Sequence, residues 1–196
     1  MIFETIIISV DLAGKPHLAP FGIKYEGEHV IISPYKPSTT LANILATKCA
    51  TMNLTDDVRV FAGAICKMQN LSSLQTISLQ ANNHAGCRLI DCLAHVDLEL
   101  LEVRDDATRP QLVMKKVAEF NYKPFAGFNR AQAAVIELAV LASRLHMLPR
   151  EKIQAEISYL QIAIDKTAGE RELEAWGWLI EKLEQFHLEN PKLCNF

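Results

Sequence analysis

The stretch that decides the fold is Ile6-Ile7-Ile8-Ser9-Val10-Asp11-Leu12-Ala13-Gly14-Lys15. Its first half is a run of β-branched residues, which favour extended backbone because their side chains fit a pleated surface. Its second half has turn chemistry, because a short acidic side chain and a glycine both favour a reversal of the chain. The stretch therefore predicts a strand that ends in a turn.

The residues that follow continue this pattern of short segments. An apolar segment over 17–25 and a strand over 28–33 are separated by Glu26-Gly27, which predicts a tight hairpin. Residues 38–47 have apolar side chains at helical spacing behind Ser and Thr caps. Residues 49–54 again read as a strand.

The chain remains β-rich to about Phe125. Residues 58–68 weakly favour a helix, whereas 88–103 and 112–122 are strand candidates. Asp105-Asp106 and the proline that follows them predict a turn between these two candidates.

From Asn129 onward, the apolar residues recur at the spacing that is typical of helices. Asn129 is a good N-cap, and Gln132 three residues later resembles a capping box at the start of a nearly all-apolar helix over 130–147. Pro149 can open a second helix, and Thr167-Ala168-Gly169-Glu170 predicts another capping box that opens a third. The fold class that follows is α+β, with a small β-barrel or sheet in residues 1–125 and a three-helix segment in 126–196 that packs on it.

The amino-acid composition and net charge exclude several classes of protein. The 196 residues are 49% hydrophobic and 22% charged, which is typical of a globular protein and argues against disorder. A net charge of -3 argues against nucleic-acid binding, which depends on neutralising phosphates. The N-terminus lacks the positive region of a secretion signal, and the longest apolar stretch is too short to span a membrane. Five cysteines without framework spacing are typical of reduced thiols, so we expect a cytoplasmic protein.

Four potential metal ligands lie close together in the sequence, namely His84, Cys87, Cys92 and His95. If Arg88 begins a strand, these side chains are spread along extended backbone and point to opposite faces, so they do not converge on one ion. We interpret them as buried thiols and incidental imidazoles and predict no metal site.

An anion site is a further candidate. Pro34-Tyr35-Lys36-Pro37-Ser38-Thr39-Thr40 joins a predicted strand to a predicted helix. A helix N-terminus presents free N–H groups and a positive dipole end, and hydroxyls and a lysine beside it would suit a phosphate. From the residues alone, a simple cap by Ser38 or Thr39 is the commoner explanation.

Three charged residues, Arg130, Glu137 and Arg144, recur every seventh position on the apolar helix. Seven residues is nearly two helical turns, so the three form one stripe. The stripe is consistent with a protein interface or a ligand-facing wall, and equally with a seam that faces solvent.

Several blocks of the sequence follow one another in a recognisable order. They are Glu4-Thr5-Ile6-Ile7, Ala19-Pro20-Phe21-Gly22-Ile23, the 34–43 segment, Asn53-Leu54-Thr55-Asp56-Asp57, Phe128-Asn129-Arg130-Ala131, Ala134-Val135-Ile136-Glu137 and Arg144-Leu145. Together these blocks resemble the flavoprotein family known as domain of unknown function 447. They cover nearly the whole chain. Residues 69–86 match no block.

The resemblance implies the FMN-binding split β-barrel of flavin reductases, and a homodimer with FMN at the subunit interface. The FMN phosphate would lie at Ser38, Thr39 and Thr40. The cofactor-binding residues that it implies are Ala19, Pro20, Phe21, Gly22, Tyr35, Lys36, Ser38, Thr39, Thr40, Asn53, Thr55, Asp56, Asn129 and Arg130.

Three functions remain open on this basis. The leading hypothesis is an FMN-dependent oxidoreductase or flavin reductase that uses a nicotinamide cofactor or a small-molecule substrate. The others are a non-enzymatic module that binds FMN or another phosphorylated ligand, and a structural or assembly protein. The sequence nominates no catalytic acid or base.

Overall fold

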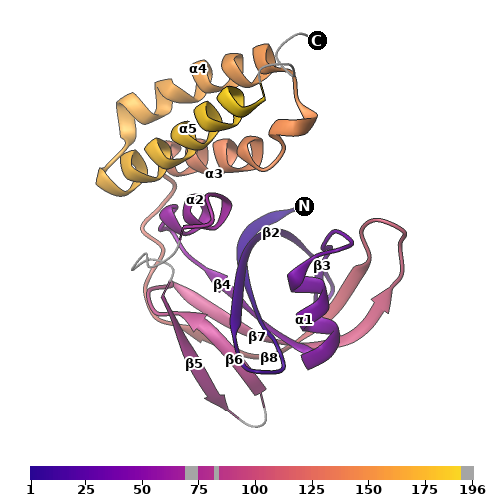
Figure 1. Ribbon diagram of the computed structural model, residues 1–196. Coiled ribbons are helices and arrows are strands. Elements are labelled where there is room, and N and C mark those ends of the chain that lie inside the picture. Colours follow the sequence, from indigo (N-terminus) through magenta and orange to yellow (C-terminus); the bar gives the residue numbers. More distant parts are fainter. Residues whose placement is uncertain (69–74, 82–83, 191–196) are drawn as a thin grey trace. The chain divides into compact units, whose positions relative to one another are not determined.

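The computed structural model describes residues 1–68, 75–81 and 84–190. The chain forms two compact units, of which one comprises Met1–Asp56 and Ser72–Phe125, and the other Asp57–Leu71 and Ala126–Phe196. The first unit is built of strands with one helix, and the second is helical (Figure 1).

Six strands of the first unit close into an antiparallel barrel. They are β1 (Phe3–Val10), β2 (Pro16–Glu26), β3 (His29–Ile32), β4 (Cys49–Leu54), β7 (Ala94–Arg104) and β8 (Gln111–Asn121). The order around the barrel is β1, β2, β3, β8, β7 and β4, and β4 pairs back with β1. The strands predicted over 6–10, 17–25, 28–33, 49–54 and 112–122 are confirmed.

The barrel interior is filled by apolar side chains, as expected for a barrel of this size. The buried cluster consists of Ile7, Ile23, Val30, Ile32, Leu41, Ile44, Ala50, Met52, Val96, Leu98, Leu112 and Met114. Two of these residues, Leu41 and Ile44, come from helix α1 (Thr39–Thr47), so the helix contributes its apolar face to the barrel core.

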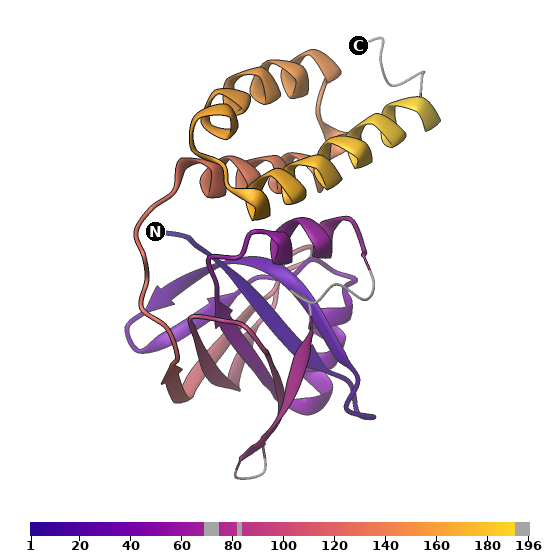
Figure 2. The same cartoon turned by 90° about the vertical axis from the view of Figure 1, so that its left-hand side faces the viewer.

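A two-stranded hairpin covers part of the outside of the barrel. It is formed by β5 (Thr76–Ala81) and β6 (His84–Leu89), and β6 lies against β1 and β4 (Figure 2). Ile6 and Ile8 point to the opposite face from Ile7 because side chains alternate along a strand, yet they are as deeply buried. Strand β1 is thus buried on both faces, which explains its unbroken run of isoleucines.

The strand predicted over 88–103 is wrong in its first part. Strand β6 ends at Leu89 and β7 begins only at Ala94, so a turn separates them. The Arg88 guanidinium stabilises this turn by donating to the carbonyls of Leu89 and Ile90. Cys87 therefore lies in β6, whereas Cys92 lies in the turn.

The second unit contains four α-helices among its described residues. They are α2 (Arg59–Ile65), α3 (Arg130–Ala142), α4 (Arg150–Thr167) and α5 (Glu170–Glu189), with a 3₁₀ turn at Leu145–Met147. Helix α2 belongs to this unit although it precedes residue 125 in the sequence. None of the described helices is long and apolar enough to cross a membrane.

The helix predicted over 130–147 is shorter than expected, because Ser143 caps it and its hydroxyl bonds to the carbonyl of Val140. Asn129 is the N-cap as predicted, since its side-chain oxygen accepts from the backbone N–H groups of residues 131 and 132. Gln132 does not complete a capping box, and donates instead to Glu172 of α5.

The capping box predicted at Thr167-Ala168-Gly169-Glu170 is displaced along the chain. Thr167 is still part of α4, so Gly169 is the N-cap of α5, and its N–H donates to the Glu172 carboxylate. The stripe of Arg130, Glu137 and Arg144 is exposed along its length.

Candidate functional site

The N-terminus of α1 presents free backbone donors. The Ser38 hydroxyl accepts from the N–H of Leu41 at 3.3 Å, and the Ala42 N–H bonds to the Ser38 carbonyl at 3.1 Å. The N–H groups of Thr39 and Thr40 precede these bonds and lie at the positive end of the helix dipole. The Thr39 side chain is exposed, whereas that of Thr40 is buried. Ser38 is thus the cap, and the donors beside it remain available to an anion.

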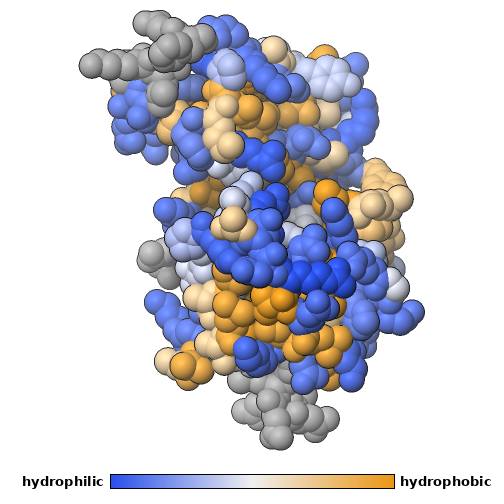
Figure 3. Space-filling view, turned by 90° about the vertical axis from the view of Figure 1, so that its right-hand side faces the viewer, coloured by the Kyte–Doolittle hydropathy of each residue, from blue (hydrophilic) through white to orange (hydrophobic). Residues whose placement is uncertain are grey.

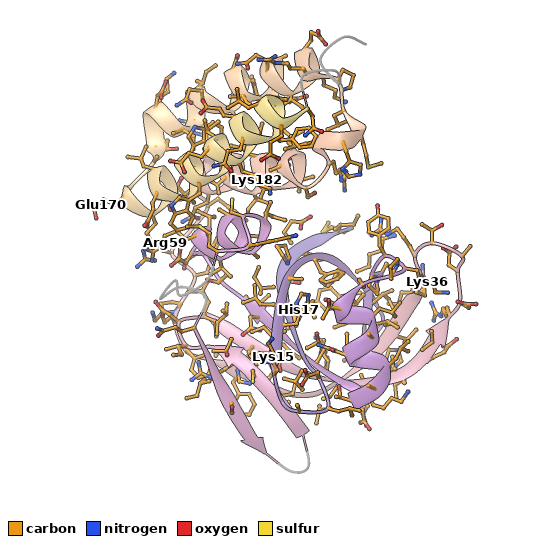
Figure 4. The ribbon with its side chains drawn as sticks, viewed as in Figure 1. Lys15, His17, Lys36, Arg59, Glu170 and Lys182 are labelled. Atoms are coloured by element: carbon orange, nitrogen blue, oxygen red, sulfur yellow. The ribbon has the colours of Figure 1, made fainter. Side chains whose placement is uncertain are left out.

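Lys36 stabilises the approach to this helix. Its ammonium group donates to Asp105 at 2.5 Å and to the Asp106 carbonyl at 2.8 Å, and its backbone N–H donates to the Thr108 carbonyl (Figure 4). The hydrogen bond and charge of Lys36 hold the pKa of the Asp105 carboxyl below its usual value. Lys36 therefore holds the segment before α1 against the β7–β8 loop.

Arg109 is a cation that the sequence interpretation missed. Its guanidinium lies over the ring of Tyr35, 4.6 Å from the ring centroid, and donates to the Ser33 carbonyl. Within the described part of the chain, no carboxylate lies within salt-bridge distance of it. Arg109 brings positive charge to the loop before α1, from a position in the sequence that no local motif connects with Tyr35.

The segment Ala19-Pro20-Phe21-Gly22 lies in β2, which packs against α1. Ala19 and Phe21 share one face of the strand, and Phe21 packs on the barrel core. Pro20 and Gly22 share the other face. A Cβ at Gly22 would lie 2.7 Å from a methyl carbon of Ile2, so only glycine fits there without displacing this side chain. The structure therefore brings this segment and α1 together in one unit.

Asn53 lies in the interior of the unit and is fully buried. Its Oδ1 accepts from the backbone N–H of Leu89 at 2.9 Å, and its Nδ2 donates to the Thr51 carbonyl at 3.3 Å. The bond from Leu89 attaches the β5–β6 hairpin to β4, whereas the bond to Thr51 lies within β4. Thr55 and Asp56, just beyond β4, are half-buried.

Asn129 and Arg130 belong to the helical unit. Asn129 caps α3 and donates to the carbonyl of Thr167, and Arg130 is exposed. Among residues 1–68, 75–81 and 84–190, no group of three or more His, Cys, Asp or Glu side chains could hold a metal ion.

Solved structures identify the class of this architecture. The chain superposes on a protein with a split-barrel domain from Shewanella frigidimarina that is described as a proposed flavin reductase (TM-score 0.51, 14% identity, 66% of this chain and 74% of that chain). It also superposes on flavoredoxin from Methanosarcina acetivorans (TM-score 0.52, 14% identity, 62% and 73%). The fold is therefore the split barrel of flavin-reductase-like proteins, as expected.

The chain belongs to the DUF447 family, named as a protein of unknown function. The model of the family's N-terminal domain matches residues 3–121, and the C-terminal model matches residues 129–181. An FMN-bound member of this family from Methanosarcina mazei has a TM-score of 0.79 and 24% identity, over 93% of this chain and 95% of that chain. No curated protein sequence matches the chain.

The first prediction concerns Asn53. Substitution Asn53→Ala leaves the buried N–H of Leu89 without an acceptor, and we expect the free energy of unfolding of the barrel unit to fall by about 1–3 kcal/mol. Urea denaturation measures the loss, and hydrogen exchange at the Leu89 amide should become faster. Asn121→Ala, at an exposed position on β8, is the matched control. Unchanged exchange at Leu89 would show that Asn53 does not hold the hairpin.

Proposed function

We propose that this protein binds FMN on its barrel unit and acts as a flavin-dependent oxidoreductase. The observation that carries the proposal is the N-terminus of α1, where the N–H groups of Thr39 and Thr40 lie next to the hydroxyls of Ser38 and Thr39. The FMN-bound structure from the same family and the flavin-reductase-like neighbours support it.

The chemistry of this terminus suits the phosphate of FMN. A phosphate group needs hydrogen-bond donors and positive potential, and a helix N-terminus supplies both. The Thr39 hydroxyl is exposed and can donate, and the Ser38 hydroxyl can donate while its oxygen accepts from Leu41. Arg109 adds positive charge nearby, whereas the Lys36 ammonium is already bound to the loop that follows β7.

The segment of Ala19, Pro20, Phe21 and Gly22 would lie along the ring system of the flavin. Gly22 is exposed, and the side chains of Ile2 and Glu4 lie beside it. Tyr35 offers an exposed aromatic face next to the same helix. Thr55 and Asp56 would complete the pocket, with Asn53 supporting them from inside.

When bound, FMN supplies the hydride or electron transfer, and the protein supplies binding and orientation. A nicotinamide cofactor or another small molecule would deliver the electrons. Asn129 and Arg130 stay predicted cofactor contacts, to be tested by substitution.

Substitution Thr39→Val tests the phosphate site. The change keeps the shape of the side chain and removes one hydroxyl donor, so we expect the Kd for FMN to rise about tenfold, or about 1.4 kcal/mol. The Kd for riboflavin, which lacks the phosphate, should change little. Flavin fluorescence titration measures both constants.

The same substitution at the other end of α1, Thr47→Val, is the matched control and should leave the Kd for FMN unchanged. If the wild-type chain does not bind FMN at micromolar concentration, the proposed function fails. If Thr39→Val weakens FMN and riboflavin equally, the phosphate does not lie at this helix.

Enzymatic activity is tested by anaerobic reduction. We expect NADH or NADPH to bleach the visible absorption of the bound flavin, and an added electron acceptor to restore it with steady consumption of the nicotinamide. A flavin that stays oxidised with both nicotinamides and is reduced only by dithionite would favour the alternative of a non-enzymatic binding module.

A homodimer is the expected assembly, with FMN at its interface. Apolar side chains gather on the surface of the barrel unit (Figure 3), and its exposed large apolar residues include Leu45, Leu101, Val103 and Val117. Apolar patches of this kind favour protein interfaces. Light scattering should give twice the 21.9 kDa mass of the chain, and a monomer mass at micromolar concentration would contradict this prediction.

A further inference from the structure

A polar cluster is buried outside the barrel interior, between the barrel wall and the β5–β6 hairpin. Thr51 of β4 and His95 and Asp97 of β7 have exposed fractions of 0%, 1% and 3%. Thr51 is paired with Asp97 in the ladder, and Asn53 with His95, so these side chains share one face of the sheet. Hairpin strand β6 lies over β4 on this side.

Three atoms of the cluster have no hydrogen-bond partner within the described residues, namely Thr51 Oγ1, His95 Nε2 and Asp97 Oδ1. His95 Nε2 and Asp97 Oδ1 are 3.5 Å apart but are not aligned for a hydrogen bond. Buried polar atoms of native proteins are almost always satisfied by the protein or by ordered water, and each orphan costs about 1–3 kcal/mol. Because Thr51 and Asp97 are partners in the ladder and His95 Nε2 lies 3.5 Å from Asp97 Oδ1, one common partner can serve all three atoms.

The other side of the His95 ring is already fixed. Nδ1 lies 3.0 Å from the hydroxyl of Tyr122, and the ring of Phe120 is stacked on the imidazole at 4.7 Å between centroids. The Arg88 guanidinium of β6 lies 4.4 Å from the centroid of the Tyr122 ring. The imidazole is therefore held in place, so it cannot rotate freely to satisfy Nε2 elsewhere.

We propose that Thr51, His95 and Asp97 form a closed site for a single water molecule. The water donates one hydrogen to His95 Nε2 and the other to Asp97 Oδ1, and its oxygen accepts from the Thr51 hydroxyl. Nδ1–H of the neutral imidazole then donates to the Tyr122 oxygen. Every orphaned atom gains a partner, and the water makes the three hydrogen bonds that are typical of buried water.

Two other arrangements fit less well. A direct bond from Nε2–H to Asp97 would leave the Thr51 hydroxyl without a partner and needs an alignment that the side chains do not have. Among the described side chains, a metal ion would find only one imidazole and one carboxylate here, fewer than the usual ligands of a protein metal site. Burial, and the positive charge of Arg88, lower the pKa of His95, whereas Asp97 opposes this shift. The neutral imidazole that the water site requires is consistent with that balance.

A high-resolution crystal structure of the full chain is the first test. We expect one density peak within hydrogen-bond distance of all three atoms, without anomalous signal. Nitrogen-15 NMR of His95 is the second test, and the imidazole should be protonated at Nδ1 and unprotonated at Nε2. A direct His95–Asp97 bond with Nε2 protonated, or an anomalous peak from a metal, would overturn the proposal.

Substitution Thr51→Val supplies a matched perturbation. It keeps the shape of the side chain and removes one partner of the water, so we expect a shift of the His95 Nε2 resonance and loss or displacement of the density peak. Thr108→Val removes a hydroxyl at an exposed position in the β7–β8 loop, away from the cluster, and should leave the resonance unchanged. An unmoved Nε2 resonance in folded Thr51→Val protein would also overturn the proposal.

Discussion

Burial of the barrel wall on both faces is the constraint on which the first unit depends. The interior takes one face of β1 and β4, and the β5–β6 hairpin lies over the other. A wall strand in this position has no bulk water to satisfy its polar side chains, so each must find a partner in the protein or in an ordered water molecule. Asn53 does so by accepting the Leu89 N–H, and this bond also attaches the hairpin. The same hydrogen bond therefore gives the buried Asn53 oxygen of β4 a donor and positions the β5–β6 hairpin over the strand.

The candidate anion site at the N-terminus of α1 depends on backbone N–H groups rather than on charged side chains. The chain has a net charge of -3, and Lys36, which precedes α1, is already bound to Asp105. A phosphate can nevertheless be held where a helix begins, since the first N–H groups have no partners within the helix. The loop between β7 and β8 matters here because it fixes the segment that leads into the helix. Its contribution is positional, apart from the positive charge of Arg109.

Local signals explain which parts of the fold could be predicted from the sequence. The β-branched run at residues 6–8, the Gly27 hairpin, and the caps Ser38 and Asn129 depend on a few neighbouring residues, and the structure confirms them. The break between β6 and β7 was missed because Arg88 forms it by bonding to carbonyls beside it, inside a stretch with the composition of a strand. Arg109 was missed because its partner Tyr35 is distant in the sequence, and only folding brings them together.

The outer wall of the barrel shows why alternation alone does not predict exposure. In β4, Thr51 and Asn53 alternate with Ala50 and Met52, a pattern typical of a strand with one face in water. Both faces are buried here, so a second protein layer can produce the same pattern as solvent. The two cases differ in how the polar side chains form hydrogen bonds. Solvent water can bond to them in any arrangement, whereas under a covering protein layer each polar atom needs a partner at a specific position. Asn53 has such a partner in the Leu89 N–H. Thr51 Oγ1, and the atoms of His95 and Asp97 on β7, have none among the described residues, so at this place the covering layer does not supply the hydrogen bonds that the wall requires.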